Sequence, residues 1–164
     1  MISYRNAEHK DVSRLVNLEI EVMAELREQI GETFPIFDEK RNNETSLLSI
    51  VEGGCGCAIV ALEEEVIDMQ KIIGAVIALD GEYTSHQGGN AKSLVMMNLF
   101  LKAEHRGRGI GMELVARMED FAKEQGYDDI IAMSFMPNPI VSRILETRGY
   151  PITSETRTKR LDSD

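Results

Sequence analysis

A glycine-rich turn between an apolar strand pattern and an amphipathic helix pattern constrains this chain more than any other feature. Residues 93–101, "SLVMMNLFL", are apolar at nearly every position, which is typical of a strand covered on both faces. Residues 105–115, "HRGRGIGMELV", then place three glycines directly before a helical pattern of apolar residues. The first amides of such a helix lack backbone partners and carry the positive end of the helix dipole. The turn therefore predicts an anion site built from main chain.

The spacing of the glycines narrows the ligand of this turn. A P-loop requires a lysine followed by serine or threonine after its last glycine, and none follows here. The dinucleotide fingerprint usually lies on the first strand and has a third glycine where this chain has Leu114. The pattern R-x-x-G-x-G does fit, as Arg106, Gly109 and Gly111. The expected ligand is a pyrophosphate, with Arg106 and Arg108 adding charge at the mouth. A tight turn that serves packing alone is the alternative.

The remaining patterns predict one α/β domain over residues 1–164, with a mixed sheet and helices on both faces. Asp11 is expected to cap the first helix. Residues 82–92 read as a long loop. The expected strands are 2–5, 57–62, 72–79, 93–101, 129–135 and an edge strand at 156–161, and the expected helices are 12–30, 39–51, 110–125 and 138–149.

Charge and composition exclude several classes of partner. The net charge of -10 argues against nucleic acid, which needs clustered Lys and Arg. It is compatible with a cationic substrate, although acidity that only keeps the protein in solution is the commoner reason. No apolar run could span a bilayer and the first residues lack a signal-peptide layout, so we expect a cytoplasmic protein without a membrane partner. Cys55 and Cys57 have no nearby ligands to complete a metal site, and reduced thiols are expected.

On these motifs the chain resembles the GNAT superfamily of N-acetyltransferases. That family carries Q/R-x-x-G-x-G/A after its fourth strand, and "LFLKAEHRGRGIG" is similar to it. "SYRNAEHKDVSRLVNL", "IIGAVIAL" and "NPIVSRILETRGY" resemble the family's opening, third strand and fourth helix. The resemblance implies a mostly antiparallel central sheet of about six to seven strands. It also implies that strands 4 and 5 splay apart.

The resemblance also implies acetyl-CoA as co-substrate and assigns residues to it. Main-chain amides of the glycine turn would bind the pyrophosphate, and the end of the strand before the turn would pair with the pantetheine arm. Asn138 would bond the pantetheine through its side chain, and a helix cap before Pro139 is an equally good local reading. The implied cofactor-binding residues are Phe100, Leu101, Arg106, Gly107, Arg108, Gly109, Ile110, Gly111, Met112 and Asn138.

The catalytic residues depart from the family pattern. In many members a tyrosine of the fourth helix acts as the acid, and Leu145 stands in that position here. Positions where relatives carry a glutamate base read Met96, Met97 or Met133. None of these side chains can transfer a proton.

A few other residues are weak candidates for acid or base. Glu82 and Tyr83 belong to the expected loop before the fourth strand, and Ser134 lies near the end of the fifth. Asn98 on the fourth strand could orient a water. His105 is expected to be exposed and to have no partner. A water chain could also deprotonate the amine, leaving the protein mainly to position the reactants.

The expected function is therefore an acyltransferase that moves acetyl from acetyl-CoA directly to a primary amine of a small or peptidic acceptor. The alternative is a non-catalytic acyl-CoA-binding regulatory module with the same fold, which the leucine at position 145 would suit. A nucleotide-binding domain of another fold is a third reading. The sequence leaves both a monomer and a homodimer open.

Overall fold

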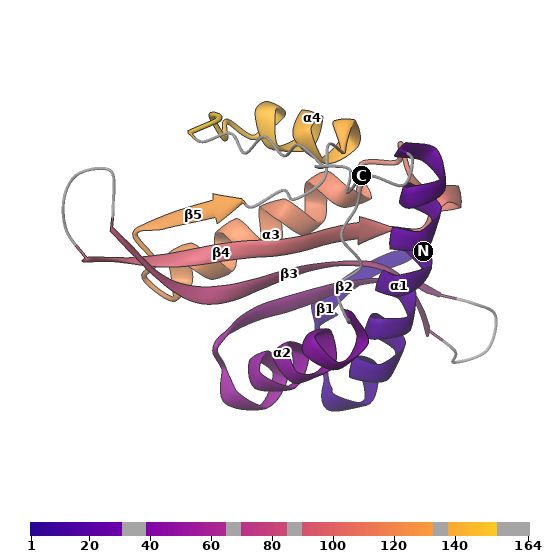
Figure 1. Cartoon of the computed structure of the whole chain (residues 1–164), viewed down its shortest axis with the longest axis horizontal. Coiled ribbons are helices and arrows are strands. Elements are labelled where there is room, and N and C mark those ends of the chain that lie inside the picture. Colours follow the sequence, from indigo (N-terminus) through magenta and orange to yellow (C-terminus); the bar gives the residue numbers. More distant parts are fainter. Residues whose placement is uncertain (31–38, 65–69, 85–89, 133–137, 154–164) are drawn as a thin grey trace, which may run out of the picture.

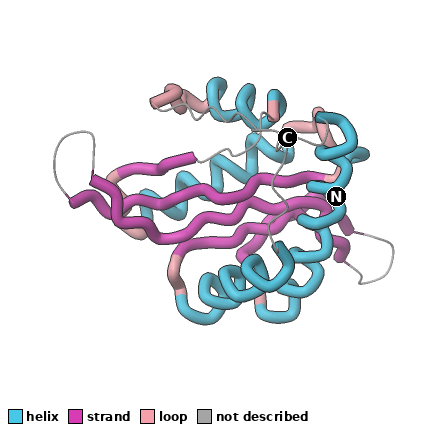
Figure 2. The backbone as a smooth tube through the Cα atoms, viewed as in Figure 1, coloured by secondary structure: helices cyan, strands magenta, loops and turns pink. Residues whose placement is uncertain are grey.

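A mixed, mostly antiparallel sheet forms the centre of the molecule (Figures 1 and 2). The computed structural model describes residues 1–30, 39–64, 70–84, 90–132 and 138–153. Within these residues the sheet has five strands in the order β1-β2-β3-β4-β5. The first four run antiparallel to their neighbours, and β5 runs parallel to β4. The strands are β1 (Ile2–Asn6), β2 (Gly56–Glu64), β3 (Gln70–Thr84), β4 (Asn90–Leu101) and β5 (Asp129–Ala132).

Helices cover both faces of this sheet, as the sequence predicts (Figure 1). One core lies between the sheet and the helix pair α1 and α2, and a second lies on the other face under α3 and α4. Strand β2 alternates between the two cores, since Val60 packs in the first and Ile59 in the second. The helices are α1 (Val12–Ile30), α2 (Glu39–Gly53), α3 (Ile110–Glu124) and α4 (Pro139–Thr147), with single 3-10 turns η1 (His9–Asp11) and η2 (Ala103–His105).

Two expectations about the sheet need correction. The expected six to seven strands are not confirmed, since the described residues form five, and the edge strand expected at 156–161 lies outside them. The hairpin of β3 and β4 is longer than the sequence suggested. Glu82 pairs with Lys92 and Tyr83 with Ala91, so both lie in a strand rather than a loop. Ladder hydrogen bonds continue along a hairpin wherever aromatic and β-branched residues tolerate the extended backbone.

Asp11 does not cap α1. It is the last residue of η1, and its carboxylate accepts the main-chain N–H of Glu8 at 2.8 Å. Arg5 of β1 donates to the same carboxylate through both terminal nitrogens, at 2.5 and 3.1 Å. Asp11 is buried, and this arrangement ties the first strand to the start of α1.

The end of β4 extends past β5, and this feature positions the functional site. The β4–β5 register ends where Met96 pairs with Ala132. Beyond it, Met97–Leu101 has β3 on one side, and no strand of the described residues on the other. The β3–β4 register also shifts here, because Ile77 pairs with Asn98 while Ala78 pairs with Met96. Met97 is therefore the extra residue of a bulge. We call Met97–Leu101 the open edge of β4.

Candidate functional site

The main chain of Leu101 faces away from β3, toward the side that the open edge leaves without a strand. The N–H of Lys102 donates to the carbonyl of Ile73 in β3, at 2.9 Å. Successive residues of a strand point their main-chain groups to opposite sides, so those of Leu101 point the other way. A Cβ on Gly74 would lie 2.7 Å from the carbonyl oxygen of Phe100, so this carbonyl lies against β3. The Phe100 side chain is buried against α1 and α2. Of the two residues expected at pantetheine, the geometry favours Leu101.

The glycine turn forms a cradle of main chain at the end of this edge. Gly109 has φ 79° and is the N-cap of α3, where no side chain caps the first turn. The N–H of Glu113 donates to the carbonyl of Gly109 at 3.1 Å, which is the first hydrogen bond of the helix. The amides of residues 110–112 come before this bond and so have no partner within the helix. A Cβ on Gly107 or Gly109 would meet no atom within 4 Å. The start of α3 thus has no side-chain cap and has open space beside its glycines, and the anion site there stays a prediction.

The guanidinium of Arg106 is not directed at the helix start. Its two terminal nitrogens donate to the carboxylate of Glu25 in α1, at 2.7 and 3.0 Å. Its Nε donates to the carbonyl of Leu101 at 3.1 Å. All three guanidinium nitrogens are therefore engaged, and the side chain ties α1 to the end of β4. Arg108 is exposed, and its contribution of charge to this site stays a prediction.

His105 is buried, contrary to the expectation from sequence. Its Nδ1 lies 3.2 Å from a terminal nitrogen of Arg108, and its Nε2 lies 3.5 Å from a carboxylate oxygen of Glu63 in β2. A guanidinium only donates, so Nδ1 is the acceptor of this bond and the ring proton sits on Nε2, toward Glu63. No sequence signal links these residues, because β2 and the turn are far apart in the chain.

Asn138 is the N-cap of α4, and its side-chain oxygen accepts the main-chain N–H groups of Ile140 at 3.1 Å and Val141 at 3.3 Å. The cap uses the oxygen, so the amide nitrogen is the group that could donate to a ligand. The prediction that Asn138 caps the helix is confirmed. A hydrogen bond from its amide nitrogen to pantetheine is compatible with this cap. Helix α4 packs closely on the first turn of α3, where a Cβ on Gly111 would lie 2.9 Å from Cδ1 of Ile144.

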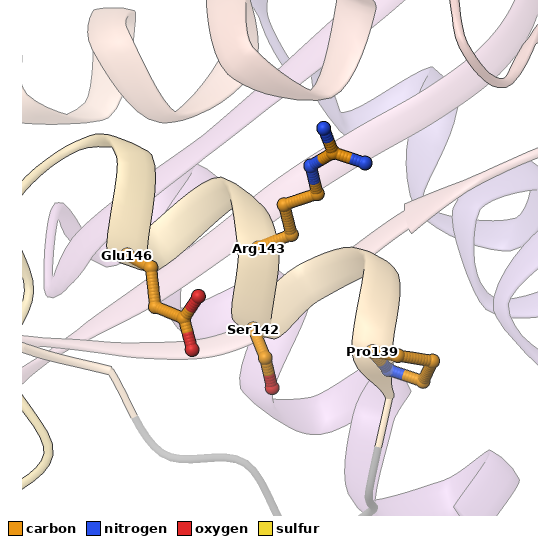
Figure 3. Close-up of a pocket in the computed structure, with 4 residues that line it drawn as sticks. All are labelled: Pro139, Ser142, Arg143 and Glu146. Carbon is orange, nitrogen blue, oxygen red and sulfur yellow. The ribbon is translucent and has the colours of Figure 1, made fainter.

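The outer side of α4 carries an open depression that we do not assign to the site (Figure 3). Figure 3 shows Arg143 extending from one side of the helix and Ser142 and Glu146 from the other. These residues and Pro139 line it, and all four are exposed. The depression pairs one cation with one carboxylate, so it offers an anion no net attraction.

Asn98 lies on the open edge of β4 and meets a buried carboxylate. Its side-chain amide donates to Oε1 of Glu19, a residue of α1 that is 4% exposed. Sequence reasoning missed Glu19, although a signal was available. It lies four residues after Leu15 and three before Val22, on the stripe of α1 that packs into the core.

The other catalytic candidates are not brought to this edge. Glu82 and Tyr83 lie near the far end of the β3–β4 hairpin (Figure 1). Tyr83 pairs with Ala91, and Asn98 is seven positions further along β4, roughly 23 Å at about 3.3 Å per residue. Ser134 lies outside the described residues.

Comparison with known proteins decides the family. The model of the Acetyltransferase (GNAT) family matches residues 21–150. The chain belongs to the GNAT family. Among curated relatives, human N-acetyltransferase 8 is 29% identical over 100 residues, which is 61% of this chain and 40% of that protein. Rat N-acetyltransferase 8 is 28% identical over 86 residues, 52% of this chain and 37% of the relative. The chain thus spans about two fifths of the length of these relatives.

Solved structures share the GNAT fold along nearly the whole chain. A predicted acetyltransferase of Clostridium acetobutylicum, solved with acetyl-CoA, has a TM-score of 0.75 at 19% identity, covering 98% of this chain and 96% of the other. An aminoglycoside N-acetyltransferase, solved with a bisubstrate analogue of CoA and acetylneamine, has a TM-score of 0.69 at 14% identity, covering 99% of both chains. At these identities the likeness shows the fold.

In this protein, the positions where other GNAT members carry a catalytic tyrosine or glutamate hold side chains that cannot transfer a proton. Leu145 of α4 is half-buried and packs into the core under α3 and α4. Met96 is buried in the same core. Met97 occupies the bulge, and Met133 lies outside the described residues. Among the residues that the structure describes, the open edge of β4 presents main-chain groups and the Asn98–Glu19 pair.

Cys57 is on β2, two strands away from β4, and Cys55 precedes β2. Cys57 is buried at the start of β2, and burial together with the nearby Asp80 charge raises the pKa of its thiol to about 12. Cys55 is exposed, and both thiols are free. Among the residues that the structure describes, no three His, Cys, Asp or Glu side chains are grouped to hold a metal ion. In the same part of the chain, no helix is both long and apolar enough to cross a bilayer.

Proposed function

We propose that this GNAT protein is an N-acetyltransferase that uses acetyl-CoA to acetylate a primary amine of a small or peptidic acceptor. One observation carries the proposal. The uncapped, glycine-lined start of α3 adjoins the open edge of β4, so a phosphate cradle and a strand edge meet at one place. The acetyl-CoA of the Clostridium acetobutylicum structure and the CoA-linked aminoglycoside of the second neighbour support both substrates.

The pyrophosphate of CoA would lie against the amides from Gly107 to Met112. Positive-φ glycines and the helix dipole favour an anion there, and Arg108 adds charge from the exposed side. The pantetheine arm would add to the open edge as a strand does, through the main chain of Leu101. The amide nitrogen of Asn138 would donate to it. Arg106 serves by holding the edge and α1 together.

The reaction proceeds by direct transfer between the two bound substrates. The amine nitrogen forms a bond to the thioester carbon, the C–S bond breaks, the nitrogen loses one proton to solvent, and CoA leaves as the thiolate. A main-chain N–H of the open edge would polarise the thioester carbonyl. Leu145 supplies no acid, so solvent protonates the thiolate, and catalysis rests mainly on positioning. Because both cysteine thiols are free, we place the protein in the reducing cytoplasm.

The first experiment tests the co-substrate. Thermal unfolding is measured with acetyl-CoA, with NAD and with ATP. Acetyl-CoA is expected to raise the Tm, since a ligand that binds only the folded protein stabilises it by mass action. Stabilisation by NAD or ATP and none by acetyl-CoA would contradict the proposal.

The second experiment tests the transfer. CoA release is followed with a thiol reagent across a panel of amines, and each product is examined by mass spectrometry for a gain of one acetyl group. Turnover with at least one primary amine is expected. Binding of acetyl-CoA without turnover of any amine would instead identify a regulatory acyl-CoA-binding module.

A further inference from the structure

A buried carboxylate and an amide meet beside the open edge, and this pair is the least expected feature of the fold. Glu19 comes from α1 and Asn98 from β4, 79 residues apart in the chain. Glu19 is 4% exposed, and placing a carboxylate in a core is costly unless it is hydrogen-bonded. Asn98 supplies such a bond and is itself only half-buried. The pair thus links the interior of the protein to a more exposed position on β4.

The chemistry of the pair fixes the orientation of the Asn98 amide. Nδ2 of Asn98 is the donor to Oε1 of Glu19, so the NH₂ group of the amide faces Glu19. Its carbonyl oxygen, Oδ1, then points away from Glu19 as a hydrogen-bond acceptor. Hydrogen bonds that share a group polarise one another, so the bond to Glu19 makes Oδ1 a stronger acceptor.

The pair lies on the opposite face of the sheet from the start of α3. Asn98 is two residues past the last β4–β5 pair, and its side chain contacts α1 on the opposite face of the sheet from α3. The cradle is at the start of α3. Glu25, six residues after Glu19 in α1, is held by Arg106, which also donates to the carbonyl of Leu101, so a second contact fixes α1 to the end of β4.

We propose that Asn98 binds the acceptor amine through Oδ1 and that Glu19 is its positioning residue, an inference that rests on the proposed function. Oδ1 accepts one N–H of the neutral amine and leaves the nitrogen lone pair free to attack. The new N–C bond forms as C–S breaks, and the nitrogen then loses its other proton to solvent. A primary amine keeps the N–H bonded to Oδ1 throughout, because its amide product retains one hydrogen. A secondary amine must give up its only N–H.

The pair therefore makes a primary amine the preferred acceptor class, and this selectivity is the readout. The amine panel contains 1,4-diaminobutane, benzylamine and a dipeptide with a free N-terminus, each alongside its N-methyl counterpart. For the wild-type protein, kcat/KM is expected to be about tenfold or more higher for the primary member of a pair. Equal rates for both members would overturn the inference even if no variant folded.

Two variants test the two roles separately. Asn98→Leu removes the acceptor atom, and Glu19→Gln keeps the shape of the side chain but lets the Asn98 amide turn either way. Both are expected to lower kcat/KM for the primary amine about tenfold and to reduce the primary-to-secondary ratio toward one. The matched control is Glu28→Gln, which removes the same charge from an exposed position of α1 and should leave both values unchanged.

Acetyl-CoA binding separates this inference from the proposed function. Both site variants should keep the wild-type rise in Tm with acetyl-CoA, because the cradle is on the other face. Turnover by the wild type with an unchanged amine ratio in Asn98→Leu and Glu19→Gln would overturn the inference alone. Absence of wild-type turnover with every amine would overturn the proposed function, and this inference with it.

Discussion

On the α3 side of the open edge one continuous segment supplies the proposed CoA-binding surface, whereas on the α1 side the contacts come from distant parts of the chain. Residues 101–112 provide a strand end, a glycine turn and a helix start in direct succession. Glu19 and Asn98 are brought together only by the fold. The first surface acts through main-chain groups and tolerates many side chains. The second depends on two particular side chains, so substitutions should affect it more selectively.

Each side is also fastened by an arginine–carboxylate pair. On the α1 side, Arg5 holds Asp11 at the start of the helix. On the α3 side, Nε of Arg148 donates to Oε1 of Glu119 at 2.8 Å, which fastens the end of α4 to α3. Glu25 and Arg106 form a third pair, which connects the two sides. These pairs allow the comparison to be tested one side at a time.

The largest expected effect follows from disturbing the cradle. Gly109→Val places a β-branched residue at φ 79°, a conformation that costs an L residue about 1–2 kcal/mol. The amides at the start of α3 must shift to relieve this strain. The dissociation constant for acetyl-CoA, measured by calorimetry, should rise about 30-fold, which corresponds to ~2 kcal/mol.

The control for this change lies at the other end of α3. Gly126 has φ 69°, and a Cβ there would meet no atom within 4 Å. Gly126→Val imposes the same kind of strain and should lower the Tm comparably, while acetyl-CoA affinity stays at the wild-type value. Equal loss of affinity in both variants would mean that the cradle has no special role.

The next effect concerns how the stability of the protein depends on pH through the Arg5–Asp11 and Arg148–Glu119 pairs. Burial favours a raised pKa for Asp11, but the hydrogen bonds from Arg5 and from the Glu8 amide hold it below its usual value. The hydrogen bond from Arg148 lowers the pKa of Glu119 despite partial burial. A carboxylate whose pKa is lower in the folded protein than in the unfolded chain contributes to stability. The contribution is fully present above the unfolded-state pKa of about 4, and it is lost as the pH falls through the folded-state pKa.

Asp11→Asn and Glu119→Gln should therefore both destabilise the protein at pH 7 and flatten the loss of stability below about pH 4. We expect about 2 kcal/mol for Asp11→Asn, because the carboxylate is fully buried and accepts three hydrogen bonds. We expect about 1 kcal/mol for Glu119→Gln, since that side chain is more exposed. Urea unfolding between pH 2 and pH 7 measures both, and a greater loss in Glu119→Gln would reverse the ranking.

A smaller effect is expected from breaking the Arg106–Glu25 pair, which joins α1 to the end of β4. Arg106→Met and Glu25→Leu, alone and combined, form a double-mutant cycle on a half-buried, bidentate pair. Its coupling energy should be about 1 kcal/mol in urea unfolding. A coupling below ~0.3 kcal/mol would show that α1 is placed by apolar packing alone.

The smallest expected effect is on the thiols. Cys55 is exposed and should react with iodoacetamide at pH 8, whereas Cys57 is buried, with a pKa of about 12, and should not. Turnover should be unchanged by labelling and by Cys55→Ser, as direct transfer requires. Mass spectrometry of the labelled protein counts the modified thiols. Loss of turnover on labelling would point to an acyl-cysteine intermediate instead.

The contrast between the two sides also explains what could be predicted from the sequence. The bounds of α1, the strand before the glycine turn and the start of α3 are local patterns, and the structure agrees with them. Partners joined by the fold leave no such pattern. Arg106 was expected at phosphate because nothing near it in the chain indicates Glu25. The strand positions of Glu82 and Tyr83 depend on cross-strand pairing, which a single segment does not reveal.

Glu19 is an intermediate case. A charged residue on the apolar stripe of α1 was visible in the sequence, and it indicates a buried group that needs a partner. The identity of that partner could not be predicted, since Asn98 lies on a strand whose register is set by β3 and β5. Charged residues on an apolar stripe therefore merit separate attention in a sequence.

The open edge of β4 has a consequence for how the protein persists in a cell. Strand edges without a neighbour can pair with other chains and so promote aggregation. On the proposed function, acetyl-CoA occupies this edge much as a missing strand would. Co-substrate at a hundred times its dissociation constant would add about 2.7 kcal/mol to the free energy of unfolding. The metabolic supply of acetyl-CoA would then govern the lifetime of the protein as well as its turnover.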